Sequence, residues 1–111
     1  MFERLNAYRI MWIMVLFDLP TETAQEKRNY AQFRKKLQQN GFEMFQFSAY
    51  MRHCPSREFA DKYISYLRKI LPEYGHVGIL CITDKQFEMM EIFYGRKKVT
   101  SPETGIQLTM F

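Results

Sequence analysis

The chain has 111 residues, of which 47% are hydrophobic, 16% aromatic and 25% charged, and its 16 Lys and Arg against 12 Asp and Glu give a net charge of +4. This length corresponds to one domain, the composition excludes a disordered chain, and the mild positive charge is compatible with a nucleic-acid partner. No apolar stretch approaches the roughly 20 residues of a membrane-spanning helix, and two cysteines cannot build a disulfide framework, so we expect a cytoplasmic protein with free thiols.

The first predicted element is a strand over Met11–Phe17, after an N-terminal extension of residues 1–10. We expect one domain to occupy residues 11–111. The strand is apolar at every position, which is typical of a central strand covered on both faces. It ends at Asp18-Leu19-Pro20, because proline lacks the N–H group that a sheet requires.

A basic helix follows this strand. Thr23 and Glu26 form the T-x-x-E pattern of a capping box, which predicts a helix that runs to about Gln39. Asn40-Gly41 predicts its end, since glycine adopts the left-handed conformation easily. The residues at helical spacing that we expect to be buried are Tyr30, Phe33 and Leu37.

The middle of the chain is predicted as an extended segment followed by a second helix. Phe42–Arg52 is either one long bent strand or two short strands, and we expect one face to carry Phe45, Phe47, Ala49 and Met51. Ser56 is the predicted N-cap of the second helix, which Pro72 and Gly75 follow. Its expected inward residues are Phe59, Tyr63, Tyr66, Leu67 and Ile70.

The last third of the chain contains further strands. His76–Thr83 is predicted as a second centrally buried strand, and Ile106–Phe111 as a final apolar strand that pairs with an edge of its own sheet or of another subunit. Between them we expect a helical turn at Asp84–Phe87, a strand at Met89–Tyr94, a basic turn at Gly95–Lys98 and a loop at Ser101–Gly105. This order predicts an α+β fold of the ferredoxin-like βαββαβ type, an antiparallel sheet with two helices on one face and an extra C-terminal strand.

Asp18 is the leading candidate for a functional residue, because it lies where a buried strand ends. Metal-assisted phosphodiester hydrolysis needs a divalent ion held by oxygen ligands, and one carboxylate without a general base is too little. We therefore expect a second Asp18 from a twofold-related subunit. The alternative is that Asp18 only braces the Leu-Pro turn through a side-chain hydrogen bond.

Positive charge gathers between residues 27 and 52, where six basic residues stand against Glu43. Such a ridge can follow a phosphate backbone without reading bases, although an ordinary solvated helix face has the same pattern. The six basic residues are Lys27, Arg28, Arg34, Lys35, Lys36 and Arg52. Arg96-Lys97-Lys98 is a second basic cluster that is either a phosphate-binding surface or an ordinary solvated surface. We interpret the His53-Cys54 pair as structural and not as a metal or nucleophile site.

The order and spacing of these landmarks resemble the CRISPR-associated protein 2 family, in the branch that accompanies Cas9-type systems. The resemblance covers about Met11–Phe111. The residues that carry it include Phe17-Asp18-Leu19-Pro20, Phe33-Arg34-Lys35, Gln46-Phe47-Ser48-Ala49-Tyr50-Met51-Arg52 and Ile82-Thr83-Asp84-Lys85-Gln86-Phe87.

The resemblance implies a ferredoxin-like homodimer that works with the CRISPR-associated integrase in spacer acquisition. Asp18 would face its twin across the dimer axis and bind Mg²⁺, with Mn²⁺ as an alternative. The duplex DNA to be inserted would contact Arg28, Arg34, Lys35 and Arg52. The C-terminal strand would lie at the dimer interface through Ile106, Leu108 and Met110.

Two functions of different classes follow from this resemblance. In one, the dimer is an adaptor that bridges integrase dimers and holds double-stranded DNA, and Asp18 is dispensable. In the other, it is a metal-dependent endonuclease that acts on RNA or DNA. Because the predicted site is poor in catalytic groups, we favour the adaptor. A toxin-type metal-dependent endoribonuclease of the same fold is a third interpretation.

Overall fold

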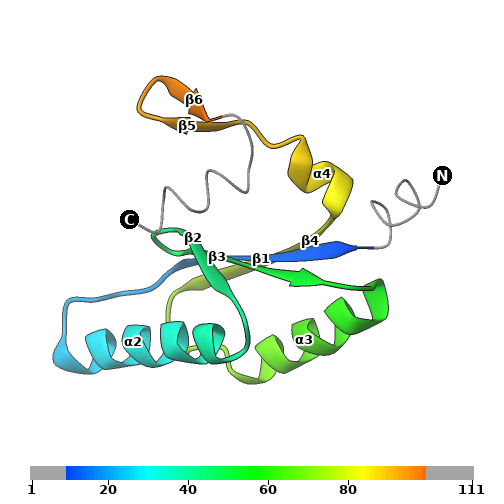
Figure 1. Cartoon of the computed structure of the whole chain (residues 1–111). Helices are drawn as coiled ribbons and strands as arrows, with labels where there is room; N and C mark the ends of the chain where they lie inside the picture. Colours follow the sequence, from blue (N-terminus) through cyan, green and yellow to red (C-terminus); the bar gives the residue numbers. More distant parts are fainter. Residues whose placement is uncertain (1–9, 100–111) are drawn as a thin grey trace.

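The structure is a computed structural model that describes residues 10–99 (Figure 1). It is an α+β fold in which a four-stranded antiparallel sheet is accompanied by three helices and a separate two-stranded hairpin. The strands are β1 (Met11–Asp18), β2 (Glu43–Gln46), β3 (Ala49–Cys54), β4 (His76–Thr83), β5 (Ile92–Tyr94) and β6 (Lys97–Val99). The helices are α2 (Ala24–Gln39), α3 (Arg57–Lys69) and α4 (Asp84–Glu88).

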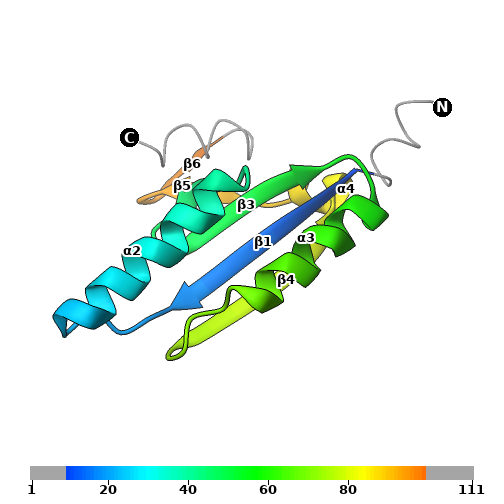
Figure 2. The same cartoon turned by 90° about the horizontal axis from the view of Figure 1, so that it is seen from below.

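The main sheet has the strand order β2-β3-β1-β4, and every neighbouring pair is antiparallel. Helices α2 and α3 lie side by side under one face of this sheet, whereas α4 and the β5–β6 hairpin lie on the opposite side (Figures 1 and 2). This arrangement confirms the predicted ferredoxin-like fold, with both long helices on one face.

The predicted limits of α2 are confirmed. Thr23 is the N-cap, its hydroxyl oxygen accepts a hydrogen bond from Glu26 N at 3.0 Å, and a Glu26 carboxylate oxygen accepts one from Thr23 N at 2.9 Å. This reciprocal pair satisfies backbone donors that the first helical turn leaves free. Asn40 is the C-cap, and Gly41 follows at φ +81°.

The main core lies between the sheet and the two long helices. From β1, alternate residues point into it, and Ile13 and Val15 are fully buried there. Helix α2 contributes Phe33 and Leu37, while Tyr30 is half-buried. In α3 the buried residues are Ala60 and Leu67, and the other predicted inward residues, Phe59, Tyr63, Tyr66 and Ile70, are partly buried.

Within residues 10–99, the opposite face of the sheet is covered at one end only. There the Trp12 indole stacks on Phe87 with ring centroids 4.1 Å apart, and its N–H donates a hydrogen bond of 2.7 Å to an Asp84 carboxylate oxygen. These contacts fix α4 near the start of β1. Farther along this face, Leu80, opposite Met14 in the middle of β1, is 50% exposed, and Leu16 is 45% exposed.

Two predictions about strand burial are therefore wrong. Among residues 10–99, strand β4 is an edge strand of the main sheet and not a central one; exposed and partly buried residues alternate up to Leu80, and the last three residues are partly buried. Strand β1 is central, but Leu16 and Asp18 on its second face are exposed. An apolar strand sequence does not reveal whether its second face is covered by the same chain or by another surface.

The segment Phe42–Arg52 forms two strands joined by a tight turn, which settles the alternative left open by the sequence. Phe47 does not share a face with Phe45, Ala49 and Met51 as predicted, and is 86% exposed. The pairing register shifts between Met44 and Gln46, and the backbone turns at Ser48 with φ +64°. These features interrupt the two-residue alternation of a regular strand.

The end of the described chain differs in detail from the prediction. Met89 is the C-cap of α4, so the predicted strand begins only at Ile92 and pairs with Lys97–Val99 in a hairpin. Residues 1–9 and the predicted elements at Ser101–Gly105 and Ile106–Phe111, including Ile106, Leu108 and Met110, lie outside the described residues. Within residues 10–99, no helix is long and apolar enough to cross a membrane.

Candidate metal and nucleic-acid site

Asp18 is the last residue of β1, and its side chain is exposed on the face of the sheet that α2 and α3 do not cover. Leu19 is buried directly after it, and this burial fixes the backbone where the strand ends. Within residues 10–99, no hydrogen bond or ion pair involves the Asp18 carboxylate. The turn-bracing hydrogen bond that the sequence left as an alternative is therefore not formed.

An open depression of about 250 Å³ adjoins Asp18. It brings together residues from two strands and a turn: Leu16, Phe17, Asp18, Ser48, His76 and Gly78. His76 lies directly opposite Asp18 in the β1–β4 register. Because opposed residues of an antiparallel pair share a face, the carboxylate and the imidazole project to the same side. Sequence reasoning missed His76 and Ser48, since only strand pairing brings them to Asp18.

Gly75 allows the loop before β4 to approach Asp18. Its φ is +99°, and a Cβ atom there would lie 2.7 Å from the Asp18 carbonyl oxygen and 3.0 Å from Leu19 Cα. Both the conformation and the close approach to backbone atoms favour glycine. Gly75 thus helps to place His76 opposite Asp18.

We expect Gly75→Ala to lower the free energy of unfolding by about 2–3 kcal/mol. The cost of the positive φ adds to the collision of the new Cβ atom with the backbone of Asp18 and Leu19. Urea denaturation measures this loss. The matched control is Gly95→Ala, where φ is +61° but no atom lies within 4 Å of the added Cβ, so only the conformational cost of about 1 kcal/mol is expected. Equal losses in the two variants would contradict the collision at Asp18.

The residues around Asp18 fit a magnesium site only in part. Among residues 10–99, no three or more His, Cys, Asp or Glu side chains are grouped closely enough to hold a metal ion. Mg²⁺, however, often keeps several water ligands and needs only one or two carboxylates. Asp18 offers one carboxylate per chain, so two copies that meet at Asp18 would satisfy this requirement.

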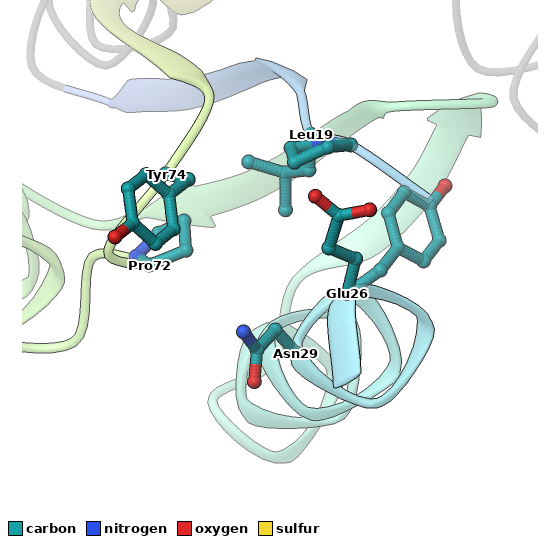
Figure 3. Close-up of a pocket in the computed structure, with 7 residues that line it drawn as sticks. Leu19, Glu26, Asn29, Pro72 and Tyr74 are labelled. Atoms are coloured by element: carbon teal, nitrogen blue, oxygen red, sulfur yellow. The ribbon is translucent and has the colours of Figure 1, made fainter. Parts of the chain in front are cut away.

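Glu26 is the acidic side chain at the start of α2, but it has a structural role. Its carboxylate accepts hydrogen bonds from the backbone N–H groups of Glu22 and Thr23. Figure 3 shows Glu26 and Asn29 across a narrow cleft from Pro72 and Tyr74. The cavity there is about 10 Å³, room for roughly one water molecule, and it cannot hold a nucleotide.

Three of the four basic candidates share the solvent-exposed side of α2, namely Arg28, Arg34 and Lys35. Arg28 donates a hydrogen bond of 2.8 Å to the Gln25 side-chain oxygen, another exposed residue of the same helix. Exposed side chains of this kind are free to reorganise around a phosphate. We call these three residues the α2 basic face.

Arg52 lies apart from the α2 basic face and has contacts inside the domain. Its guanidinium donates a hydrogen bond of 2.8 Å to the Asn40 carbonyl oxygen at the C-cap of α2. It also lies over the Tyr63 ring, 4.1 Å from the centroid. A Cβ atom on Gly41 would collide with this guanidinium. Arg52 therefore joins the end of α2 to α3.

We expect Arg52→Ala to reduce the free energy of unfolding by about 2 kcal/mol, since a hydrogen bond and a cation–π contact are both lost. Arg28→Ala is the matched control and should change it by less than about 0.5 kcal/mol, because its contact is at the surface. Thermal or urea unfolding gives both values. A small effect of Arg52→Ala would show that the guanidinium is not needed to hold α2 against α3.

The two cysteines are free, with Cys54 buried and Cys81 partly buried. Burial raises the pKa of both thiols, which favours the protonated form. A protonated thiol is a poor nucleophile and a poor metal ligand. The interpretation of Cys54 as a structural residue agrees with this environment.

The fold and the site together define a small ferredoxin-like protein with an exposed carboxylate at a strand end and a basic helix. The family model described as "CRISPR associated protein Cas2" matches residues 11–90. This chain belongs to the Cas2 family of CRISPR-associated proteins.

Similar proteins named "CRISPR-associated endoribonuclease Cas2" occur in several bacteria. The protein of Flavobacterium psychrophilum is 53% identical over 110 residues, which cover 99% of this chain and 96% of that protein. The protein of Parvibaculum lavamentivorans is 40% identical over 101 residues, which cover 91% of this chain and 100% of that protein. The protein of Paracidovorax avenae is 38% identical over 107 residues, which cover 96% of this chain and 99% of that protein.

Proposed function

We propose that this chain acts in CRISPR adaptation as a homodimeric adaptor that bridges integrase dimers and holds the double-stranded DNA to be inserted. The α2 basic face is the observation that carries this proposal, because its side chains are exposed and, among residues 10–99, form only a surface hydrogen bond between Arg28 and Gln25. Arginine and lysine in such a position bind phosphates without base specificity. Arg52 is assigned a supporting role, since it anchors the end of α2.

The homodimer is supported by the uncovered end of the sheet. Two large apolar residues remain exposed on the face that carries Asp18: Leu16, two residues before it, and Leu80, which lies opposite Met14. A second copy that covers this surface would bring two Asp18 side chains toward each other. An apolar surface next to the candidate site is the usual character of a subunit interface.

A second candidate activity is a metal-dependent endoribonuclease. It is favoured by the exposed Asp18 carboxylate beside its depression and by the similarity to proteins named as endoribonucleases. Two Asp18 carboxylates would hold the ion, and bound Mg²⁺ or Mn²⁺ would supply water activation and charge neutralisation. A toxin-type endoribonuclease would share this chemistry but would have no integrase partner.

The adaptor function is tested by a spacer-integration assay with the purified integrase, run with and without this protein. We expect integration to depend on the protein, and a complex with the integrase to appear on size-exclusion chromatography. Integration at the same rate without the protein would contradict the adaptor function. Cleavage of RNA without any integrase complex would favour the toxin-type activity.

A further inference from the structure

We propose that His76 and Ser48 bind the phosphodiester group of the substrate beside Asp18. This inference rests on the endoribonuclease activity proposed above and names the residues that would position its substrate. Asp18 can only accept hydrogen bonds, and its negative charge repels a phosphate. A bound divalent ion would only balance the charge of two such carboxylates, so neighbouring groups that donate hydrogen bonds would favour the approach of a phosphodiester.

His76 meets this requirement by its position. It is the first residue of β4 and faces Asp18 across the strand pair, on the same face of the sheet. The imidazole is exposed at the depression, and within residues 10–99 no side-chain hydrogen bond involves it. An imidazole has a ring N–H to donate in either protonation state.

Ser48 provides a second donor from the β2–β3 turn. Its carbonyl oxygen accepts a hydrogen bond of 2.9 Å from Phe17 N, which ties the turn to the residue before Asp18. Its φ of +64° is unusual for a residue other than glycine and costs on the order of 1 kcal/mol. Glycine would fit this backbone without strain, so the serine side chain has no conformational advantage there. A hydroxyl that lines the depression supplies a functional reason for serine.

The strain at Ser48 gives a variant that separates function from stability. Ser48→Gly removes the hydroxyl and relieves the backbone, so the unfolding midpoint should be unchanged or higher. The kcat/KM for cleavage of a single-stranded RNA should fall roughly 10- to 100-fold, because a hydrogen bond to a charged group is lost. A loss of activity without a loss of stability is not expected for a merely structural residue.

His76 is tested by two substitutions. His76→Ala should reduce kcat/KM by a similar factor, mainly through KM, whereas His76→Gln keeps an N–H donor and should recover most of the activity. His53→Gln is the matched control. His53 lies against Trp12, at the end of β3 that is far from Ser48 and Asp18. We expect wild-type rates for this control.

The same proposal has a readout that does not depend on cleavage. A short RNA oligonucleotide, added in EDTA to prevent cleavage, should shift the NMR signals of the His76 ring and leave those of His53 unchanged. If the ring responds but the protein never cleaves RNA with Mg²⁺ or Mn²⁺, the endoribonuclease activity fails while phosphate binding stands. If Ser48→Gly and His76→Ala cleave RNA like the wild type, or if His76→Gln is as impaired as His76→Ala, the proposed donor role is overturned.

Discussion

Asp18→Asn is expected to abolish metal-dependent cleavage of RNA, with a loss of at least about 100-fold in rate. The substitution preserves the shape of the side chain but removes the charge that holds a divalent ion, and metal assistance contributes several kcal/mol to phosphodiester hydrolysis. The fold should be unaffected, because the Asp18 side chain is exposed and makes no side-chain hydrogen bond within residues 10–99. The measurement is the cleavage rate as a function of Mg²⁺ concentration.

The same variant separates the two proposed functions. Spacer integration with the purified integrase should remain at the wild-type level. The adaptor needs only the α2 basic face and its assembly as a homodimer with the integrase. A folded Asp18→Asn protein that cannot support integration would contradict the adaptor as we describe it. Full cleavage by this variant would show that Asp18 does not hold the metal.

Neutralising the α2 basic face should weaken the binding of duplex DNA by more than tenfold at about 0.1 M salt. In the triple variant Arg28→Gln, Arg34→Gln, Lys35→Gln, each lost phosphate contact removes about 0.9 from the slope of log K against log salt concentration. Fluorescence anisotropy over a range of salt concentrations gives both the affinity and the slope. Sequence preference should remain weak, because these contacts carry no base readout.

The matched control removes the same charge from α3. Lys62, Arg68 and Lys69 are exposed there, and their replacement by glutamine changes the net charge equally. We expect a much smaller loss of affinity and an almost unchanged salt slope. Equal losses in the two triple variants would show that overall charge, and not the α2 basic face, determines DNA binding.

The elements that local chemistry determines were predictable from the sequence. The capping box at Thr23 and Glu26 and the N-cap at Ser56 occur where the sequence predicts them, and the predicted helical turn at Asp84 begins with a capping box at Thr83 that the sequence analysis did not identify. Caps depend on side chains three residues apart, so no long-range information is needed. The ferredoxin-like order followed from these helices and the strands between them.

The errors concern properties that depend on distant parts of the chain. The β4 sequence is mostly apolar, yet among residues 10–99 the strand lies at an edge of the sheet, because sheet position depends on which strands pair and not on composition. Phe47 is exposed because a turn at Ser48 interrupts the alternation. Both errors bear on the site, since this turn and this edge form the surroundings of Asp18.

In the candidate site, too, the features set by local sequence were predictable, and those set by strand pairing were not. Asp18 could be chosen from its place at a strand end, but His76 is 58 positions away in the sequence, and only the antiparallel register brings it opposite. Arg52 was grouped with the helix charges because it lies near them in sequence. The fold directs its guanidinium to Asn40 and Tyr63 instead.

The stacking of Trp12 on Phe87 has a practical consequence, because the chain contains one tryptophan. Indole emission therefore comes from one site, where Trp12 meets Phe87 of α4 and His53 of β3. Asp18 lies at the far end of the same strand, so a ligand could occupy that end without touching the indole. Indole emission can therefore be used to follow the detachment of α4 from the sheet separately from events at the Asp18 end.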